Sequence, residues 1–426
     1  MRKALSYLVD ICSVGHHLTR RTQSLAVALI VAQFAEAHGQ LLVDDDAWQV
    51  GPEPRLEIGT PVDGRFALYR VAGASFLADG RIVVANDFSE LLLFGPDGDF
   101  QRSFGREGDG PGEFKRIGAI GVGNSDTLLV FDRFHSRISV FDSDGELAGT
   151  TALDAGAPVG ARMQAGPLAG GWTAQGRFVA SRSIYELPRL AANSPRQVTP
   201  MDTIYTSRPT AAELFFFDAA GTVVRKVSDL MGTEKARLLE WETNVSSISL
   251  SSIQVDVSFL KTLEVAVASN VVAFGNTAKY EIRLLNSEGQ EVATIRRPGE
   301  PSEVTETDRE RWIEDRLTGI GDPKTRRSRR SLLETLELPT TVPQFRSLAI
   351  QEGGRIWVEE FRIPAEANGP STWQVYDSAG AHLGEAVLPA GFRPFSITRD
   401  EVMGLWRDEL DVEFIRVYEL EGAAIG

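Results

Sequence analysis

The feature that most constrains the fold is a run of short apolar segments and tight turns within residues 104–147. A glycine-rich turn covers residues 105–112, and apolar segments follow at 117–122, 127–132 and 137–141. Asp144-Gly145 then signals a turn before a last segment that begins at Leu147. Short β-strands joined by Gly, Asp and Asn turns pair as antiparallel sheets. The pattern therefore predicts one sheet of four short strands.

The same pattern recurs along the chain in more degenerate copies. Residues 63–66 (DGRF) parallel residues 111–114 (PGEF), and residues 74–87 and 91–105 parallel the strands that follow. Later copies are marked by hairpin patterns at 213–227, 265–295, 346–387 and 395–420. Repeated sheets of this kind predict a β-propeller with one sheet per blade.

The last copy runs out of chain after three strands. Residues 54–59 (PRLEIG) lie where a fourth strand is needed, because Ile58-Gly59 matches Phe104-Gly105. A strand from the N-terminal part would complete the last blade and remove an exposed sheet edge. We therefore predict an all-β fold, a six-bladed β-propeller closed by the strand at 54–59, in a single domain from residue 38 to 426. Seven blades remain the alternative if residues 231–259 contain another one.

The stretch from 104 to 147 resembles an NHL repeat. The resemblance rests on the FG…G.G.GEF pattern, the small-residue strand GAIGV and the segment RISVFDSDG. Further along, the segment IRRPGEP precedes a charged helical insert, and this order resembles a large group of uncharacterised exported bacterial six-bladed propellers. That resemblance implies a fold and a compartment more than an activity.

Residues 301–342 interrupt the β pattern between blades four and five. Residues 303–317 predict a helix that Thr305 or Thr307 caps, and a second short helix is expected at 329–336. The insert carries a basic cluster, which we expect to pair with Glu303, Glu306, Glu310 and Glu314. A docking patch for a partner or for anionic lipid is the functional alternative. The cluster comprises Lys324, Arg326, Arg327, Arg329 and Arg330.

Residues 1–37 have the form of a signal peptide. Basic residues precede an apolar run at 25–34, and the small-x-small site Ala35-Glu36-Ala37 follows. The apolar run is shorter than the roughly 20 residues that span a bilayer. Cleavage would remove Cys12, the only cysteine, and a cysteine-free chain suits an oxidising compartment. We therefore predict an exported protein, periplasmic or extracellular, with no membrane span.

The net charge of −15 and the absence of a basic stripe argue against nucleic acid as a partner. We expect a monomer. No nucleophilic triad or phosphate-binding loop is recognisable. After cleavage only His38, His135 and His382 could be zinc ligands, and we expect each to be a surface turn residue. No cofactor is therefore predicted.

A calcium-dependent hydrolase or lyase of the six-bladed type is the alternative to a non-catalytic protein. Such an enzyme would use Asp, Asn and Glu ligands. The residues considered for that role are Asn86, Asp87, Asn124 and Asp132. These residues lie at turns, however, where Asp and Asn are favoured for backbone reasons.

An arginine stands at the start of the innermost strand in four blades. These residues are Arg70, Arg116, Arg346 and Arg393. The four blades are neighbours around a closed ring, so the arginines are expected at one level of the channel mouth. There they would attract anions, or they would pair with acids of adjacent blades. The sequence thus predicts a non-catalytic binding or scaffold propeller that recognises a protein, a peptide or a small anionic ligand.

Overall fold

The structure, a computed structural model, describes most of the chain after residue 47. The described residues are 48–61, 64–123, 126–156, 163–165, 169–173, 175–186, 203–207, 209, 211–244, 247–268, 270–363 and 369–422. The predicted signal peptide at 1–37, His38 and Asn124 lie outside them.

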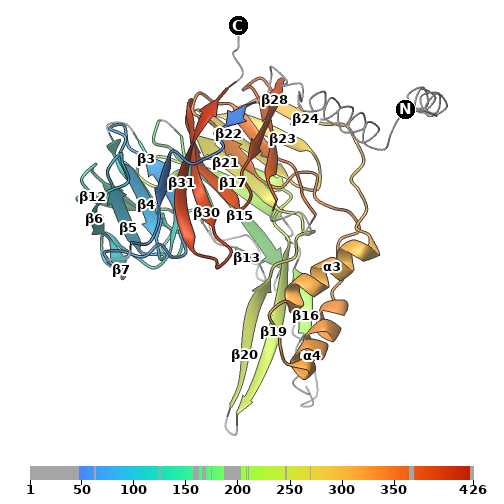
Figure 1. The fold of residues 1–426 in the computed structure, drawn as a ribbon. Helices are drawn as coiled ribbons and strands as arrows, with labels where there is room; N and C mark the ends of the chain where they lie inside the picture. Colours follow the sequence, from blue (N-terminus) through green and yellow to red (C-terminus); the bar gives the residue numbers. More distant parts are fainter. Residues whose placement is uncertain are drawn as a thin grey trace, which may run out of the picture. The chain divides into compact units, whose positions relative to one another are not determined.

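Six antiparallel sheets repeat along the described chain, and each forms one blade (Figure 1). Blade 1 contains β3 (Gly73–Phe76), β4 (Ile82–Asn86), β5 (Glu90–Phe94) and β6 (Phe100–Phe104). The glycine-rich turn contributes a short parallel pair, β7 (Arg106–Glu107) and β8 (Glu113–Phe114). Blade 2 contains β9 (Ile117–Val122), β10 (Leu128–Asp132), β11 (Arg137–Phe141) and β12 (Leu147–Ala152). Blade 3 contains β13 (Met163–Ala165), β14 (Ala169–Trp172), β15 (Phe178–Glu186), β17 (Ala211–Phe217) and β18 (Val223–Leu230).

The remaining blades come from the second half of the chain. Blade 4 contains β21 (Leu263–Ala268), β22 (Val271–Asn276), β23 (Glu281–Asn286) and β24 (Glu291–Arg296). Blade 5 contains β25 (Leu348–Ile350), β26 (Ile356–Glu359), β27 (Ser371–Tyr376) and β28 (His382–Leu388). Blade 6 contains β29 (Phe392–Ile397), β30 (Glu401–Arg407) and β31 (Glu413–Glu421) from the C-terminal part, with β1 (Gln49–Val50) and β2 (Leu56–Ile58) added to it.

The innermost strands of the blades form a closed ring. In order, β3 contacts β9, β9 contacts β14, and β14 contacts β21. The ring continues through β25 and β29, and β29 returns to β3. Each blade packs between its two neighbours, so both faces of its second strand are covered. In blade 1 the second strand, β4, is buried along its whole length. The described chain is therefore the six-bladed β-propeller that the repeats predict.

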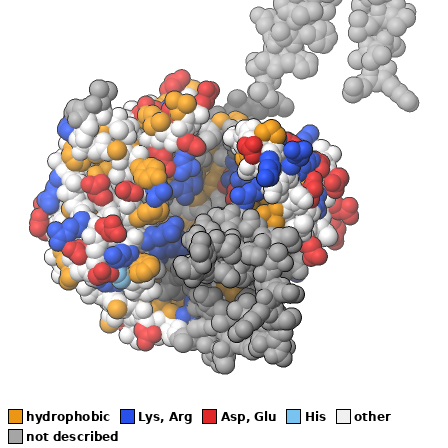
Figure 2. All heavy atoms as spheres, turned by 90° about the horizontal axis from the view of Figure 1, so that it is seen from below, with side chains coloured by type: hydrophobic (Ala, Val, Ile, Leu, Met, Phe, Trp, Pro, Cys, Tyr) orange, Lys and Arg blue, Asp and Glu red, His pale blue; other side chains and the backbone are white. Residues whose placement is uncertain are grey.

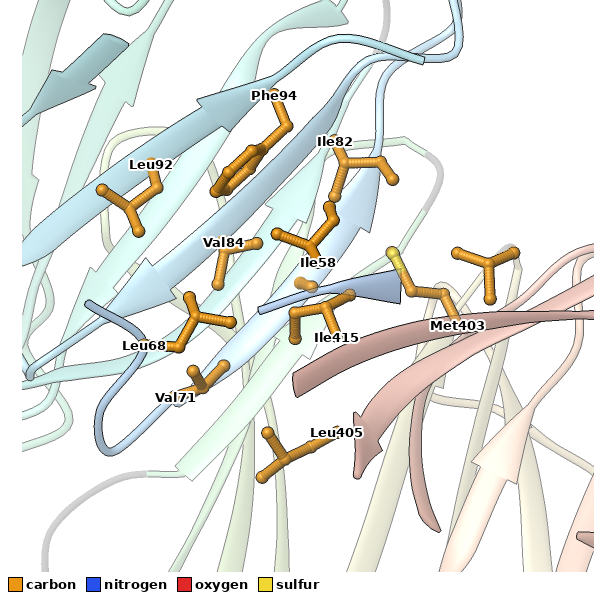
Figure 3. Close-up of a cluster of buried hydrophobic side chains, with 12 residues drawn as sticks. Ile58, Leu68, Val71, Ile82, Val84, Leu92, Phe94, Met403, Leu405 and Ile415 are labelled. Atoms are coloured by element: carbon orange, nitrogen blue, oxygen red, sulfur yellow. The ribbon is translucent and has the colours of Figure 1, made fainter. Parts of the chain in front are cut away.

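The ring closes by pairing the two ends of the described chain. β2 pairs antiparallel with β31, with Ile58 opposite Ile415, and this confirms the closing strand predicted at 54–59. β1 also pairs with β31, an addition that the sequence did not suggest. Figure 3 shows Ile58 among Ile82, Val84 and Ile415, in the cluster that joins blades 1 and 6.

A seventh blade does not form at 231–259. Instead β19 (Lys235–Asn244) and β20 (Ser247–Val255) make a long hairpin, and β16 (Thr203–Ser207) pairs with β19. This three-stranded sheet has no strand in the ring of inner strands. The alternative of a seventh blade is therefore wrong. The hairpin is joined by β16, which belongs to a segment inserted between β15 and β17 of blade 3, and the three strands form a separate sheet.

Two helices fill the predicted insert between blades 4 and 5. Helix α3 (Glu306–Leu317) begins at the N-cap Thr305, whose hydroxyl accepts from the backbone N–H of Asp308. Helix α4 (Pro323–Glu334) begins six residues earlier than predicted, because Asp322 caps it and Pro323 is its first residue. Trp312, Ile313 and Leu317 are fully buried in one cluster with Phe259 and Leu333. No helix in the described ranges is long and apolar enough to span a membrane.

The basic cluster on α4 pairs with acids in part as predicted. Arg326 contacts Glu314 at 2.5 Å, and Arg330 contacts Glu310 at 2.5 Å and also Glu314. Glu334, on the same helix, is a further partner of Arg330 at 3.0 Å. The pairing joins α3 to α4, which favours a structural role for these two arginines.

The closing strand gives a direct test of the fold. We expect Ile58→Ala to lower the free energy of unfolding by about 2–5 kcal/mol, because a side chain that is 3% exposed would leave a cavity between blades 1 and 6. Urea denaturation followed by fluorescence would measure the change. Val292→Ala is the matched control, since Val292 is 55% exposed on an outermost strand. An equal effect of the two substitutions would contradict the closure.

Candidate functional site

The four predicted arginines lie at one end of the ring, which we call the mouth. Arg70 and Arg116 precede β3 and β9, Arg346 precedes β25, and Arg393 is the second residue of β29. The inner strands of these blades are consecutive in the ring. The mouth is therefore the end at which the inner strands begin.

Buried polar residues at the ends of the second strands hold these arginine segments in place. Asn86 ends β4, and its side-chain oxygen accepts from the backbone N–H of Tyr69 at 2.9 Å. Asp132 ends β10 and is fully buried, and it accepts from the backbone N–H groups of Lys115 and Phe134 at 2.9 and 2.8 Å. These two candidate calcium ligands thus have backbone partners.

The arginines of blades 1 and 2 share an aromatic ring. The guanidinium carbons of Arg70 and Arg116 lie 5.1 and 4.7 Å from the centroid of Phe88, within the range of cation–π attraction. Phe88 lies in the turn after β4. At the corresponding turn of blade 2, Phe134 is 72% exposed. The recurrence of Asn/Asp-x-Phe at 86–88 and 132–134 is a sequence signal for these rings that the repeat analysis missed.

Arg133 is a further mouth residue that the sequence analysis did not select. Burial lowers its pKa, and the charge of nearby Arg116 lowers it further. The two guanidinium groups therefore repel each other. An anion bound between them would relieve that repulsion.

A cavity of about 1350 Å³ lies between blades 5 and 6 at the mouth. Arg346 and Arg393 both line it, so the structure brings this predicted pair together. Its apolar walls come from residues of both blades, and the turn between β30 and β31 forms part of its rim. The apolar lining includes Leu348, Trp373, Phe392, Pro394, Leu405 and Trp406.

Arg393 and Arg346 differ in their surroundings. The Arg393 side chain reaches solvent within the cavity, yet protein surrounds it closely enough that burial lowers its pKa. The charge of Arg407 lowers this pKa further, and the charge of Glu413 opposes the shift. It donates one hydrogen bond, at 3.4 Å, to the backbone carbonyl of Val71 in blade 1. Arg346 is 48% exposed and lies 3.8 Å from Glu359, which Arg362 holds more closely at 3.1 Å.

The four predicted residues thus form two groups rather than one tight cluster. Arg70 and Arg116 meet at Phe88, and Arg346 and Arg393 meet in the cavity. The alternative role, tying blades together, applies to Arg393 through its bond to Val71. It does not apply as an ion pair, because Arg393 has no carboxylate within ion-pair distance in the described part of the chain, and Glu413 acts on its charge only from further away.

Blade 4 has a lysine at the equivalent position. Lys261 precedes β21 and is 8% exposed, and its ammonium group donates to the backbone carbonyl of Thr341 at 2.5 Å. Burial lowers its pKa to about 8. Lys261 therefore anchors the return of the helical insert and does not extend the arginine groups.

His135 bridges two carboxylates beside the arginines of blade 2. Its Nδ1 lies 2.7 Å from Asp132 and its Nε2 lies 2.8 Å from Asp109 in the glycine-rich turn. Hydrogen bonds to Asp132 and then to Asp109 raise its pKa. His135 lies in a turn as predicted, but its bridging role was not predicted. The ring of His382 instead contacts Gln374 at 2.7 Å.

The described residues contain no group of three or more His, Cys, Asp and Glu side chains arranged to hold a metal ion. Asp87 has a positive φ of 39° and lies in the turn with Phe88, a conformation that Asp tolerates. Figure 2 shows several Lys and Arg side chains toward the middle of the described surface seen from below.

A family model, DUF5128, described as a 6-bladed beta-propeller, matches residues 74–174. The match covers blades 1 and 2 and the inner strand of blade 3. This agrees with the propeller that the described strands form. No curated protein matches the chain. The description of this family does not name the NHL repeat, so that resemblance stays a prediction.

The solved structures that match the chain are distant. A candidate exported protein of Bacteroides fragilis has a TM-score of 0.46 at 10% identity, over 90% of this chain and 97% of its own. A DUF4221 member from Bacteroides vulgatus has a TM-score of 0.43 at 9% identity, over 89% and 100%. Regucalcin of Agrobacterium tumefaciens, described as a calcium-binding protein, has 0.39 at 12%, over 83% and 92%.

The His135 bridge predicts a pH-dependent stability. Protonated His135 stabilises the fold through its two carboxylate partners. Because the pKa of His135 is raised in the folded protein, this contribution is complete below the unfolded pKa of about 6.5 and is lost as the pH rises through the folded pKa. Burial opposes ionisation of Asp132, but its hydrogen bonds hold its pKa below the usual range, so its contribution is lost only in strong acid. We expect His135→Asn to destabilise the protein more at pH 5.5 than at pH 9 in chemical denaturation. His382→Asn is the control, and an equal loss for His135→Asn at both pH values would contradict the bridge.

Proposed function

We propose that the mouth of this propeller binds an anionic ligand without catalysing a reaction on it. The observation that carries the proposal is a set of guanidinium groups that lack carboxylate partners within the described residues, those of Arg70, Arg116, Arg133 and Arg393. The chain has 59 acidic residues against 44 basic ones, so carboxylates are abundant. Arginines that stay unpaired in such a protein are available to a ligand carboxylate or phosphate.

Electrostatic repulsion at the mouth supports the same proposal. The pKa values of Arg133 and Arg393 are lowered by burial and then by a neighbouring arginine, Arg116 and Arg407 respectively, although the charge of Glu413 partly opposes this effect at Arg393. The charged forms are therefore less stable there than in water. A bound anion would restore the missing counter-charge, and such perturbed groups concentrate at functional sites.

A binding role fits the chemistry of these groups better than a catalytic role. Guanidinium groups donate hydrogen bonds but do not exchange protons near neutral pH. They also sit on rigid strand ends that present a fixed pattern of charge. No observation on the described residues favours a calcium-dependent hydrolase or lyase, so we propose binding alone.

We also infer that the protein is exported to the periplasm or the cell exterior. The support is the order of basic, apolar and small residues in residues 1–37. In that setting the ligand would be an envelope or extracellular molecule. A protein, a peptide or a small anion would each supply the required negative charge.

Charge reversal tests the proposal. We expect Arg116→Glu combined with Arg346→Glu to weaken binding of polyglutamate and of citrate by about tenfold or more, because each substitution replaces an attraction by a repulsion. Isothermal titration calorimetry at low ionic strength would measure the dissociation constants, since salt screens such contacts.

The control keeps the same change in net charge. Arg102→Glu combined with Arg399→Glu alters two exposed arginines away from the mouth, whose side chains are 43% and 88% exposed. This control should retain most of the binding. Unchanged binding by the mouth variant, or an equal loss in both variants, would overturn the proposal.

A further inference from the structure

The cavity between blades 5 and 6 is lined by more charged side chains than its ion pairs account for. Arg362 is paired with Glu359 at 3.1 Å, and Arg407 is paired with Glu413 at 2.6 Å. Asp408 accepts from the backbone N–H groups of Leu410 and Val412 at 2.8 and 2.9 Å, which closes the turn between β30 and β31. These lining groups are occupied.

Two cationic and two anionic side chains are left over. Arg393 forms no ion pair in the ranges that the structure describes. Arg346 has a weak ion pair with Glu359, at 3.8 Å, because Arg362 and Ser347 contact the same carboxylate more closely. Glu409 and Asp411 are exposed on the turn and form no ion pair with any described residue. The cavity therefore keeps both signs of charge available.

The two signs lie at different depths. Arg346 and Arg393 belong to the starts of innermost strands, next to the ring axis. Glu409 and Asp411 lie between the second and third strands of blade 6, which are further from the axis because the sheet order is β29, β30, β31. The cavity is therefore positive toward the axis and negative toward the rim.

Apolar surface lies within the same cavity. Leu348 and Trp406 are partly exposed in its lining, and Phe392 and Trp373, which also line it, are buried. Leu410 is 84% exposed on the rim turn, between the two acids. An exposed leucine next to an open cavity suits contact with an apolar ligand group.

We propose that this cavity binds a short peptide segment, with an acidic group toward Arg346 and Arg393, apolar side chains against the cavity walls and a basic group toward Glu409 and Asp411. The inference rests on the proposed function and names the ligand of the same mouth. The cavity volume of about 1350 Å³ exceeds the roughly 300–1,000 Å³ of small-molecule sites. A peptide with an acidic end, a basic end and apolar side chains between them would contact the arginines, the two acids and the apolar walls, and it would suit the large volume. A simple anion would contact only the arginines.

Peptide libraries of defined charge test the proposal. Each hexapeptide is acetylated and amidated, has four randomised apolar positions, and has lysine at one end and glutamate at the other, in both orders. Two companion libraries replace either the lysine or the glutamate by glutamine. Equilibrium dialysis against the protein, followed by mass spectrometry, measures how much of each library is retained.

We expect the doubly charged library to be retained about tenfold better than either companion, since each end makes charge-assisted contacts. Glu409→Gln combined with Asp411→Asn should reduce its retention to that of the glutamate-only library and leave the latter unchanged. Arg346→Gln combined with Arg393→Gln should reduce both. Asp97→Asn combined with Asp99→Asn is the matched control, since these are two exposed acids with the same spacing in a turn of blade 1.

The outcomes separate the two proposals. Equal retention of the doubly charged and glutamate-only libraries, or no effect of the Glu409 and Asp411 substitutions, would overturn the peptide assignment and leave anion binding standing. Binding of citrate without retention of any library would do the same. Absence of citrate and polyglutamate binding by the wild type, or arginine variants that bind these anions as the wild type does, would overturn the proposed function.

Discussion

The structure depends on the pairing of β31 with β1 and β2, because only this pairing turns a row of blades into a ring. The closing strand is three residues long, yet Ile58 connects the core of blade 6 to the core of blade 1. The mouth depends on the same joint. Arg393 of blade 6 donates to the carbonyl of Val71, and Glu413 accepts from the N–H of Val71 at 2.8 Å. Closure therefore fixes the relation between the cavity arginine and the arginines of blades 1 and 2.

Sequence patterns predicted the regular blades and the helical insert, but they did not predict the inner strand of blade 3 or the segment inserted into that blade. The strands predicted at 117–122 and 137–141 begin and end at the observed residues, because tight turns bound them on both sides. The hairpin of blade 3 was found, but its inner strand was not, since the AGGW segment of β14 has no alternating pattern. The sheet of β16, β19 and β20 could not be predicted locally. Its strands are separated by two strands of blade 3, and nothing in the sequence of β16 indicates that it pairs with β19 rather than with blade 3.

The arginines were predictable because they recur at one position of the repeat, whereas their partners were not. Whether an arginine meets a phenylalanine, as Arg116 meets Phe88, depends on how one blade packs on the next. The same holds for Lys261, which has the repeat position of an arginine but bonds to the insert. Periodicity identifies equivalent positions, and the contacts between blades then give them different roles.

The unpaired state of the arginines follows from how the nearby acids are used. Asp132 lies next to the Arg116 segment, but both of its oxygens are occupied by backbone N–H groups and by the His135 ring. Glu359 lies near Arg346, but Ser347 and Arg362 occupy its oxygens. The acids that hold the arginine segments in position are thus unable to neutralise the guanidinium groups fully. Because these carboxylates are already hydrogen-bonded to neighbouring groups, the guanidinium groups keep their positive charge at the mouth. This arrangement favours an external anion as the missing partner.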